Sequence, residues 1–281
     1  MKRLLVIHLF LLLPFLAFAQ VKKNPYGAFN KDTVIDKARL ECIYYYLTSD
    51  PKLNESREGY EMVQIGKRYA KSVSYARFQQ DSVFTSLNYY TREDLTYKDL
   101  EPYFRKYNDP IGLPEIIKDL GNGNLEYQGK IFIDRYIYEE PKLDFGWTLT
   151  DDTLTVCGHP CHGATATFRG RVWKAWYADD IAVSSGPWKF SGLSGLILQI
   201  EDSKREHVFR AVSVRKGKSN IKKVDYRDFK TNRKWFNKAL KEHRMNPHGA
   251  VEASGIEVRE IGGNGAPPRP RRLFYNSIEK E

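Results

Sequence analysis

The densest set of reactive side chains is Cys157-Gly158-His159-Pro160-Cys161-His162, here called the cysteine–histidine cluster. Thiolates and imidazoles are good zinc ligands. Zinc motifs usually separate their cysteines by two to four residues, but they also add a second ligand pair elsewhere. The remaining candidates, His207, His243 and His248, are scattered. A thioredoxin-type redox motif has two residues between its cysteines, whereas three stand here. We therefore predict no metal site.

A structural disulfide is the interpretation we favour for Cys157 and Cys161. In an extended segment their α-carbons would lie about 13 Å apart, beyond the roughly 7 Å that a disulfide allows. The bridge therefore requires a turn, which Gly158 and Pro160 could supply. Cys42 could instead pair with either cysteine. We predict one disulfide and one free, buried thiol.

Other catalytic motifs are incomplete. The segment Gly192-Leu193-Ser194-Gly195-Leu196 lacks the last glycine of a nucleophile elbow, and we expect a strand, not a helix, after it. Acidic pairs such as Asp151-Asp152 fall at predicted turns, where such residues are common for conformational reasons. No P-loop or dinucleotide-binding glycine motif occurs. We predict no catalytic residue and no cofactor, and keep as an alternative a hydrolase or metal-dependent enzyme built on the cysteine–histidine cluster.

A block of aromatic and basic residues spans 168–190 and holds three of the five tryptophans. Successive side chains of a strand face opposite ways, so one aromatic set can build the core while the other lines a surface or groove. Such a groove suits an apolar or glycan-like ligand. The candidate binding residues are Arg169, Arg171, Trp173, Trp176, Trp188 and Lys189.

The first residues indicate export. Lys2 and Arg3 precede an apolar run from Leu4 to Phe18, and Ala17-Phe18-Ala19 has the small–x–small pattern of a cleavage site. The run is about 15 residues, short for a membrane span of roughly 20. We predict a signal peptide over 1–19 and an exported protein, periplasmic or secreted. No other stretch is apolar enough to cross a bilayer, so we do not expect an integral membrane protein.

The rest of the chain favours one β-rich domain over 38–260, after a loose lead-in at 20–37. Short β-branched or aromatic segments alternate with turn residues between 125 and 214, and no helical patterns separate them. We predict a mainly β fold, a curved antiparallel sheet or partial barrel with a C-terminal amphipathic helix, with α+β as the alternative. A strand pair is expected at 59–66 and 68–77. Helical structure is expected within 91–107, capped by Thr91 and Asp94, and at 114–120.

The C-terminal part carries the positive charge. The whole chain has 45 Lys and Arg against 35 Asp and Glu, and residues 215–244 alone hold twelve basic and three acidic residues. A basic amphipathic helix is predicted at 225–244, capped by Asp225. Its charge is either a solvated helix face or a surface for an anionic partner such as lipid head groups or an acidic protein. Nucleic acid is not expected, because the chain is predicted to be exported and lacks nucleic-acid-binding motifs.

Residues 261–281 are predicted to form a linker and a tail. Gly262-Gly263 and Pro267-Pro268 indicate a flexible or polyproline-like linker. The apolar residues between Leu273 and Ile278 are expected to dock back on the domain.

Several of these segments resemble the GLPGLI family of exported bacterial proteins. The resemblance rests on Phe-Arg-Gly-Arg at 168–171, Gly-Pro-Trp-Lys-Phe at 186–190 and Gly-Leu-Ser-Gly-Leu-Ile-Leu at 192–198. Tyr-Asn-Ser-Ile-Glu at 275–279 is similar to the family's terminal Asn-Pro-Ile-Glu. Serine replaces the family's proline in both motifs. The motif residues are Gly192, Leu193, Gly195, Leu196 and Ile197.

The resemblance implies export and a shared fold but no substrate, because the family has no established activity. We predict a non-enzymatic binding or accessory protein of the bacterial envelope, which contacts an apolar or anionic ligand or an envelope protein. A structural partner of an outer-envelope complex is a further alternative. The sequence does not determine the oligomeric state.

Overall fold

The computed structural model describes residues 31–87, 95–132, 134–225, 228–247, 249 and 272–280. Within these residues most strands join one 12-stranded sheet, in the order β14-β7-β6-β5-β4-β3-β2-β12-β11-β10-β9-β8. All neighbours in it are antiparallel except β14 and β7. The prediction of a mainly β, antiparallel fold with a C-terminal helix is confirmed.

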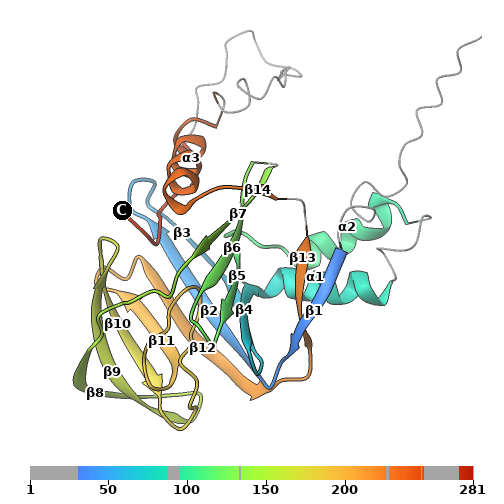
Figure 1. Ribbon diagram of the computed structural model, residues 1–281. Coiled ribbons are helices and arrows are strands. Elements are labelled where there is room, and N and C mark those ends of the chain that lie inside the picture. Colours follow the sequence, from blue (N-terminus) through green and yellow to red (C-terminus); the bar gives the residue numbers. More distant parts are fainter. Residues whose placement is uncertain are drawn as a thin grey trace, which may run out of the picture.

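The sheet consists of two meanders joined through β2 and β12 (Figure 1). The first comprises β2 (Leu40–Asp50), β3 (Glu55–Ile65), β4 (Tyr69–Ser74), β5 (Glu115–Asp119), β6 (Leu125–Ile131) and β7 (Asp134–Glu140). The second comprises β8 (Thr148–Val156), β9 (His159–Phe168), β10 (Arg171–Ala178), β11 (Leu196–Asp202) and β12 (His207–Lys216). Because β8 also contacts β12, the second meander curls into an incomplete barrel.

The helices and the remaining strands lie around the first meander. These elements are α1 (Tyr75–Ser86), α2 (Tyr97–Lys106), α3 (Arg233–Met245), the two-residue strand β14 (Phe229–Lys230), and β1 (Lys31–Lys37) paired with β13 (Asn220–Asp225). Figure 1 shows α3 and the C-terminal tail together at one end of the sheet. The main core fills the space between the meanders and includes Trp173, Phe190 and Phe209, each at most 1% exposed.

Local predictions failed where tertiary pairing outweighed sequence propensity. The predicted helix at 114–120 is strand β5, held between β4 and β6. The second predicted strand, 68–77, ends at Ser74 and continues as helix α1. In α2 the capping box is Thr96 with Asp99, while Thr91 and Asp94 lie outside the described residues.

The two ends of the predicted domain also differ from expectation. Residues 31–37 of the predicted lead-in form β1, and Asp225 ends its partner β13 instead of capping a helix. Helix α3 begins at Arg233, where the Asn232 side chain accepts a hydrogen bond from the Trp235 backbone N–H at 3.0 Å. The start moves because residues 220–225 and 229–230 pair as strands. The predicted linker largely lies outside the described residues.

Candidate functional site

A cavity of about 1070 Å³ opens between the first meander, the three helices and the C-terminal tail. Its apolar lining includes Phe84 of α1, Leu100 and Phe104 of α2, and Phe236 and Leu240 of α3. Phe84 and Leu100 belong to a small second core that α1 and α2 share. The volume falls at the upper end of the range of small-molecule sites.

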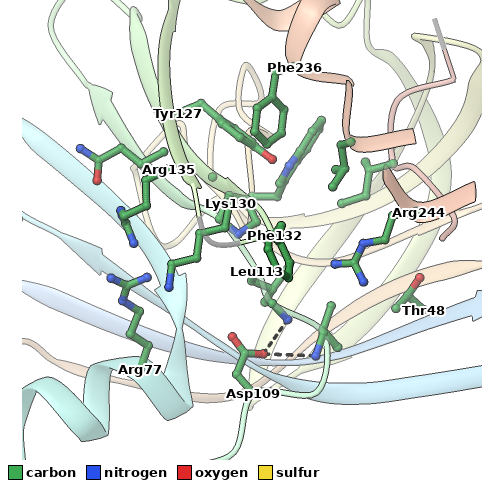
Figure 2. Close-up of a pocket in the computed structure, with 18 of the residues that line it drawn as sticks. Thr48, Arg77, Asp109, Leu113, Tyr127, Lys130, Phe132, Arg135, Phe236 and Arg244 are labelled. Atoms are coloured by element: carbon green, nitrogen blue, oxygen red, sulfur yellow. Dashed lines mark hydrogen bonds between the residues drawn. The ribbon is translucent and has the colours of Figure 1, made fainter. Parts of the chain in front are cut away.

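One side of the cavity carries a cluster of positive charge (Figure 2). Arg77 of α1 pairs with Glu115 at 3.1 Å, and Arg135 of β7 pairs with Asp228 at 3.0 Å. Lys130 lies with these arginines, is solvent-exposed, and has no ion-pair or hydrogen-bond partner within the described parts of the chain. Desolvation and the charges of Arg77 and Arg135 lower the Lys130 pKa.

A second cation faces the cavity from the other side in Figure 2. The guanidinium of Arg244, on α3, has no carboxylate partner in the portion of the chain that the structure covers. Burial and nearby Arg57 lower its pKa. Asp109, on the cavity rim, is already engaged, because its carboxylate accepts hydrogen bonds from the backbone N–H groups of Ile111 and Gly112. We call Lys130 and Arg244 the open cations.

The C-terminal tail forms another part of the cavity wall, and Glu279 anchors it. The Glu279 carboxylate accepts hydrogen bonds from Lys189 at 2.7 Å, Arg233 at 3.1 Å and Asn237 at 3.1 Å, and from Arg169. Burial raises the pKa of Glu279, but Lys189 and Arg169 outweigh it, so the net pKa is lowered.

Lys189 is the centre of this arrangement. It is 1% exposed and also donates to Glu140 at 2.5 Å and to the Tyr138 hydroxyl at 3.1 Å. Burial lowers the Lys189 pKa, and Glu279 and Glu140 partly oppose that shift. A buried cation therefore lies between a body carboxylate and a tail carboxylate.

Arg171 holds the preceding tail residues. It is 3% exposed and pairs with Asp202 at 2.7 Å and Glu206 at 2.8 Å. It also donates to the Asn276 side chain at 2.6 Å and to the carbonyl oxygens of Ser277 and Ile278. We call Arg169, Arg171, Lys189 and Arg233 the tail-binding cations.

The candidate binding residues therefore do not form one ligand site. Arg169, Arg171 and Lys189 bind the chain's own tail, Trp173 is sealed in the core at 1% exposure, and Lys174 covers the half-buried Trp176. Trp188 and Lys189 do line the cavity. The expected division into a core set and an outer set holds within β10, where Trp173 is in the core and Trp176 is half-buried, but the basic residues of the block bind the tail instead of lining a groove.

The loop that carries Trp188 and Lys189 is held by two buried titratable side chains, Glu61 and Lys118. Glu61 accepts the Trp188 backbone N–H at 3.0 Å, and Lys118 donates to the carbonyls of Gly186 and Phe190. Burial raises the pKa of Glu61 to about 7 and lowers that of Lys118 to about 7. Trp188 has a φ of 48°, so these contacts hold a backbone conformation that is unusual for a bulky residue.

The glycine motif at 192–197 is structural. A Cβ on Gly195 would lie 2.0 Å from the Ala178 carbonyl oxygen, so only glycine fits there. Leu193 is buried, and Leu196 and Ile197 are 0% exposed in the core. Gly192 adopts a φ of 97°, in the region that favours glycine.

The predicted Cys157–Cys161 disulfide is absent, since all three cysteines are free thiols. Cys157 and Gly158 form a two-residue hairpin turn with φ values of 52° and 83°, typical of type I′. This turn points the Cys157 thiol to the Ala211 carbonyl, whereas the Cys161 thiol donates to the His159 carbonyl. Burial raises the Cys161 pKa to about 11, which disfavours the reactive thiolate.

The cysteine–histidine cluster does not lie in the cavity. His159 pairs with Asp180 at 2.7 Å and His162 with Asp179 at 3.5 Å; the His159 side chain is partly exposed and the other three are exposed. No group of three His, Cys, Asp or Glu that could hold a metal ion occurs among the residues the structure describes. In the same residues no helix is both long and apolar enough to cross a membrane.

Sequence reasoning missed the open cations and the α1–α2 wall. Lys130 stands in an ordinary strand segment, and it faces a cavity only because β6, α1 and α3 lie around the same space. Arg244 belongs to the basic segment 215–244, but nothing in the sequence assigns it to a cavity. No local motif marks either residue.

One family model matches part of the chain, and two solved structures are distantly similar to it. The family described as "Protein of unknown function (Porph_ging)" matches residues 165–199, which cover β10, the Trp188 loop and part of β11. No curated protein matches the chain. A solved structure described as "Structure of PNGF-II in C2 space group" is similar at 12% identity and a TM-score of 0.49, over 73% of this chain and 33% of that one. A second, in space group P21, gives 13% and 0.48 with the same coverage. The chain thus spans about a third of the length of these structures.

Proposed function

We propose that the protein binds an amphipathic anion in the cavity beneath α3. The observation that carries the proposal is the pair of open cations, Lys130 and Arg244, which face a cavity whose walls also carry aromatic and aliphatic side chains. Lys130 is exposed and Arg244 half-buried, and neither has a carboxylate partner in the described residues, so an anionic group can pair with both. The apolar walls suit a hydrocarbon or aromatic body.

The lowered pKa values of both open cations support the same ligand class. Burial and neighbouring positive charge disfavour the charged forms of Lys130 and Arg244. An anion near them would reverse that effect and raise both pKa values. Phe236 and Leu240 of α3 and Phe104 of α2 then supply apolar contacts to the rest of the ligand.

We also propose where the protein acts. The charged start, apolar run and small–x–small motif at 1–19 support an exported binding or accessory protein of the bacterial envelope. The motifs at 168–171, 186–190 and 192–198 support a relationship to the GLPGLI family. An enzyme built on the cysteine–histidine cluster has less support, since its side chains lie outside the cavity and burial disfavours the Cys161 thiolate.

Two dyes that differ in one anionic group test the ligand class. Anilinonaphthalene sulfonate carries a sulfonate that N-phenyl-1-naphthylamine lacks, so fluorescence titration with both separates the anionic from the apolar contribution. We expect tighter binding of the sulfonate dye. The double variant Lys130→Gln/Arg244→Gln should weaken it about tenfold or more, because hydrogen bonds to charged groups contribute about 1.5–3 kcal/mol, and should leave the neutral dye unaffected.

Lys204→Gln/Lys98→Gln is the matched control, because both lysines are exposed and lie outside the cavity. It removes the same charge and should change neither titration. Equal loss of the sulfonate dye in both double variants would contradict the proposal, as would equal affinity of the wild-type protein for both dyes.

A further inference from the structure

The outer face of α3 combines lysines with exposed aromatic rings. Lys234, Lys238 and Lys241 are all exposed and are spaced by four and three residues, which places them on one helix face. Trp235 of the same helix is 46% exposed. Phe229 of the adjoining β14 is 61% exposed.

The aromatic rings of this surface are fixed. Tyr136 of β7 packs against the Trp235 ring at 5.1 Å and against the Phe229 ring at 5.7 Å. Single exposed apolar side chains are common on protein surfaces. Here two large rings are held side by side by a third, next to a row of lysines. That arrangement suits a partner that presents both apolar groups and negative charge.

The charge of this face is one-sided. Lys230 of β14 is also exposed, so within β14 and α3 four lysines stand against a single acid, Glu242, which lies 3.9 Å from Lys238. The arginines of α3 do not contribute, because Arg233 binds the tail and Arg244 lines the cavity. The helix therefore presents its lysines outward and its arginines inward.

We propose that this surface, made of Lys230, Lys234, Lys238, Lys241, Phe229 and Trp235, docks on anionic lipid head groups. Lysines near an anionic bilayer each contribute about 1 kcal/mol, and Trp favours the head-group region. An acidic protein partner would favour arginine, whose planar fork binds carboxylates in pairs, and this face has none. The inference does not depend on the cavity ligand, because it uses the opposite face of α3.

Sedimentation with vesicles tests it, using the full chain and variants that share its N-terminus. Vesicles of phosphatidylcholine alone are compared with vesicles that also contain phosphatidylglycerol, and the gain in binding on adding the anionic lipid is the readout. Lys234→Gln/Lys238→Gln/Lys241→Gln should reduce that gain about 100-fold at low salt, since 1 kcal/mol per lysine is about fivefold. About 0.5 M salt should abolish it in the wild type.

The control Lys67→Gln/Lys98→Gln/Lys204→Gln removes the same charge from exposed positions on other elements and should keep the gain. Brominated lipids should quench the wild-type tryptophan fluorescence more than that of Trp235→Phe. Equal anion dependence in the two triple variants would overturn the proposal. So would binding to an acidic polypeptide without any gain on anionic vesicles.

Discussion

Two groups of cations line the same cavity and differ in what faces them. Lys189, a tail-binding cation, is 1% exposed and lies between Glu140 and Glu279. Lys130, an open cation, is exposed and lies beside Arg77 and Arg135, with no carboxylate of its own in the described residues. The first group is neutralised by the chain itself, and the second is not.

The difference separates a structural role from a binding role. A fully buried ammonium must be paired, because the interior cannot solvate it. The tail supplies that pairing from residues far away in the sequence, so Glu279 acts like an internal ligand of Lys189. An exposed ammonium needs no internal partner and stays available to an external anion.

The largest effect is expected when Lys189, the central tail-binding cation, is removed. Lys189→Met should lower the free energy of unfolding by about 3–5 kcal/mol, because it removes the buried cation that lies between the Glu140 and Glu279 carboxylates. Lys130→Met should change it by no more than about 0.5 kcal/mol, as for most exposed positions. Urea denaturation followed by circular dichroism measures both. Similar losses in the two variants would remove the distinction between the groups.

A smaller effect is expected from the tail side of the same contact. Glu279→Gln keeps the shape of the side chain but removes its charge, so the hydrogen bonds from Lys189, Arg169 and Arg233 lose their charge-assisted character. We expect a loss of about 1.5–3 kcal/mol. Glu242→Gln, on the exposed face of α3, is the matched control and should be nearly neutral. Unchanged stability in Glu279→Gln would show that the tail contributes little.

The sequence predicted the fold class because alternating apolar residues and turns are local signals. Residues 125–214 formed antiparallel strands as expected. Segment 114–120 did not form the expected helix, because pairing with β4 and β6 decides its structure. A Pro at its start and a Gly after its end are local helix signals that tertiary contacts outweighed.

The site was predictable only in part. The sequence marked Arg169, Arg171 and Lys189 as unusual and predicted that the tail docks on the domain. That these two features are one interaction depends on contacts about 100 residues apart, such as Arg169 with Glu279. The cavity depends on the apposition of α1, α2, β6 and α3, for which the sequence carries no motif.

Acid should affect His207, a buried neighbour of the tail-binding cation Arg171. His207 is 0% exposed, and burial and the nearby Arg171 lower its pKa to about 3. Between about pH 6.5 and 3 the unfolded chain therefore holds a proton that the folded chain lacks, so this contribution to stability is lost as the pH falls. Glu61, with its pKa raised to about 7, acts in the opposite direction above pH 4.5.

Comparison with His207→Gln isolates the histidine, because the glutamine amide, which both donates and accepts, can keep the hydrogen bond with Tyr46, and Glu61 is common to both proteins. As the pH falls from about 6.5 to 4.5, the wild type should lose stability relative to the variant by up to about 1.4 kcal/mol per pH unit. Chemical denaturation at several pH values measures the difference. A constant difference would mean that His207 titrates normally.

The smallest effect concerns the open cations. Lys130→Gln/Arg244→Gln should leave the free energy of unfolding unchanged or raise it by up to about 0.5 kcal/mol, because it removes repulsion with Arg77, Arg135 and Arg57. An anionic ligand should reverse that order, since a ligand stabilises the state that binds it. Adding anilinonaphthalene sulfonate should therefore raise the melting temperature of the wild type more than that of the variant. If the variant is instead clearly less stable without ligand, these cations are structural, and the contrast with Lys189 is one of degree only.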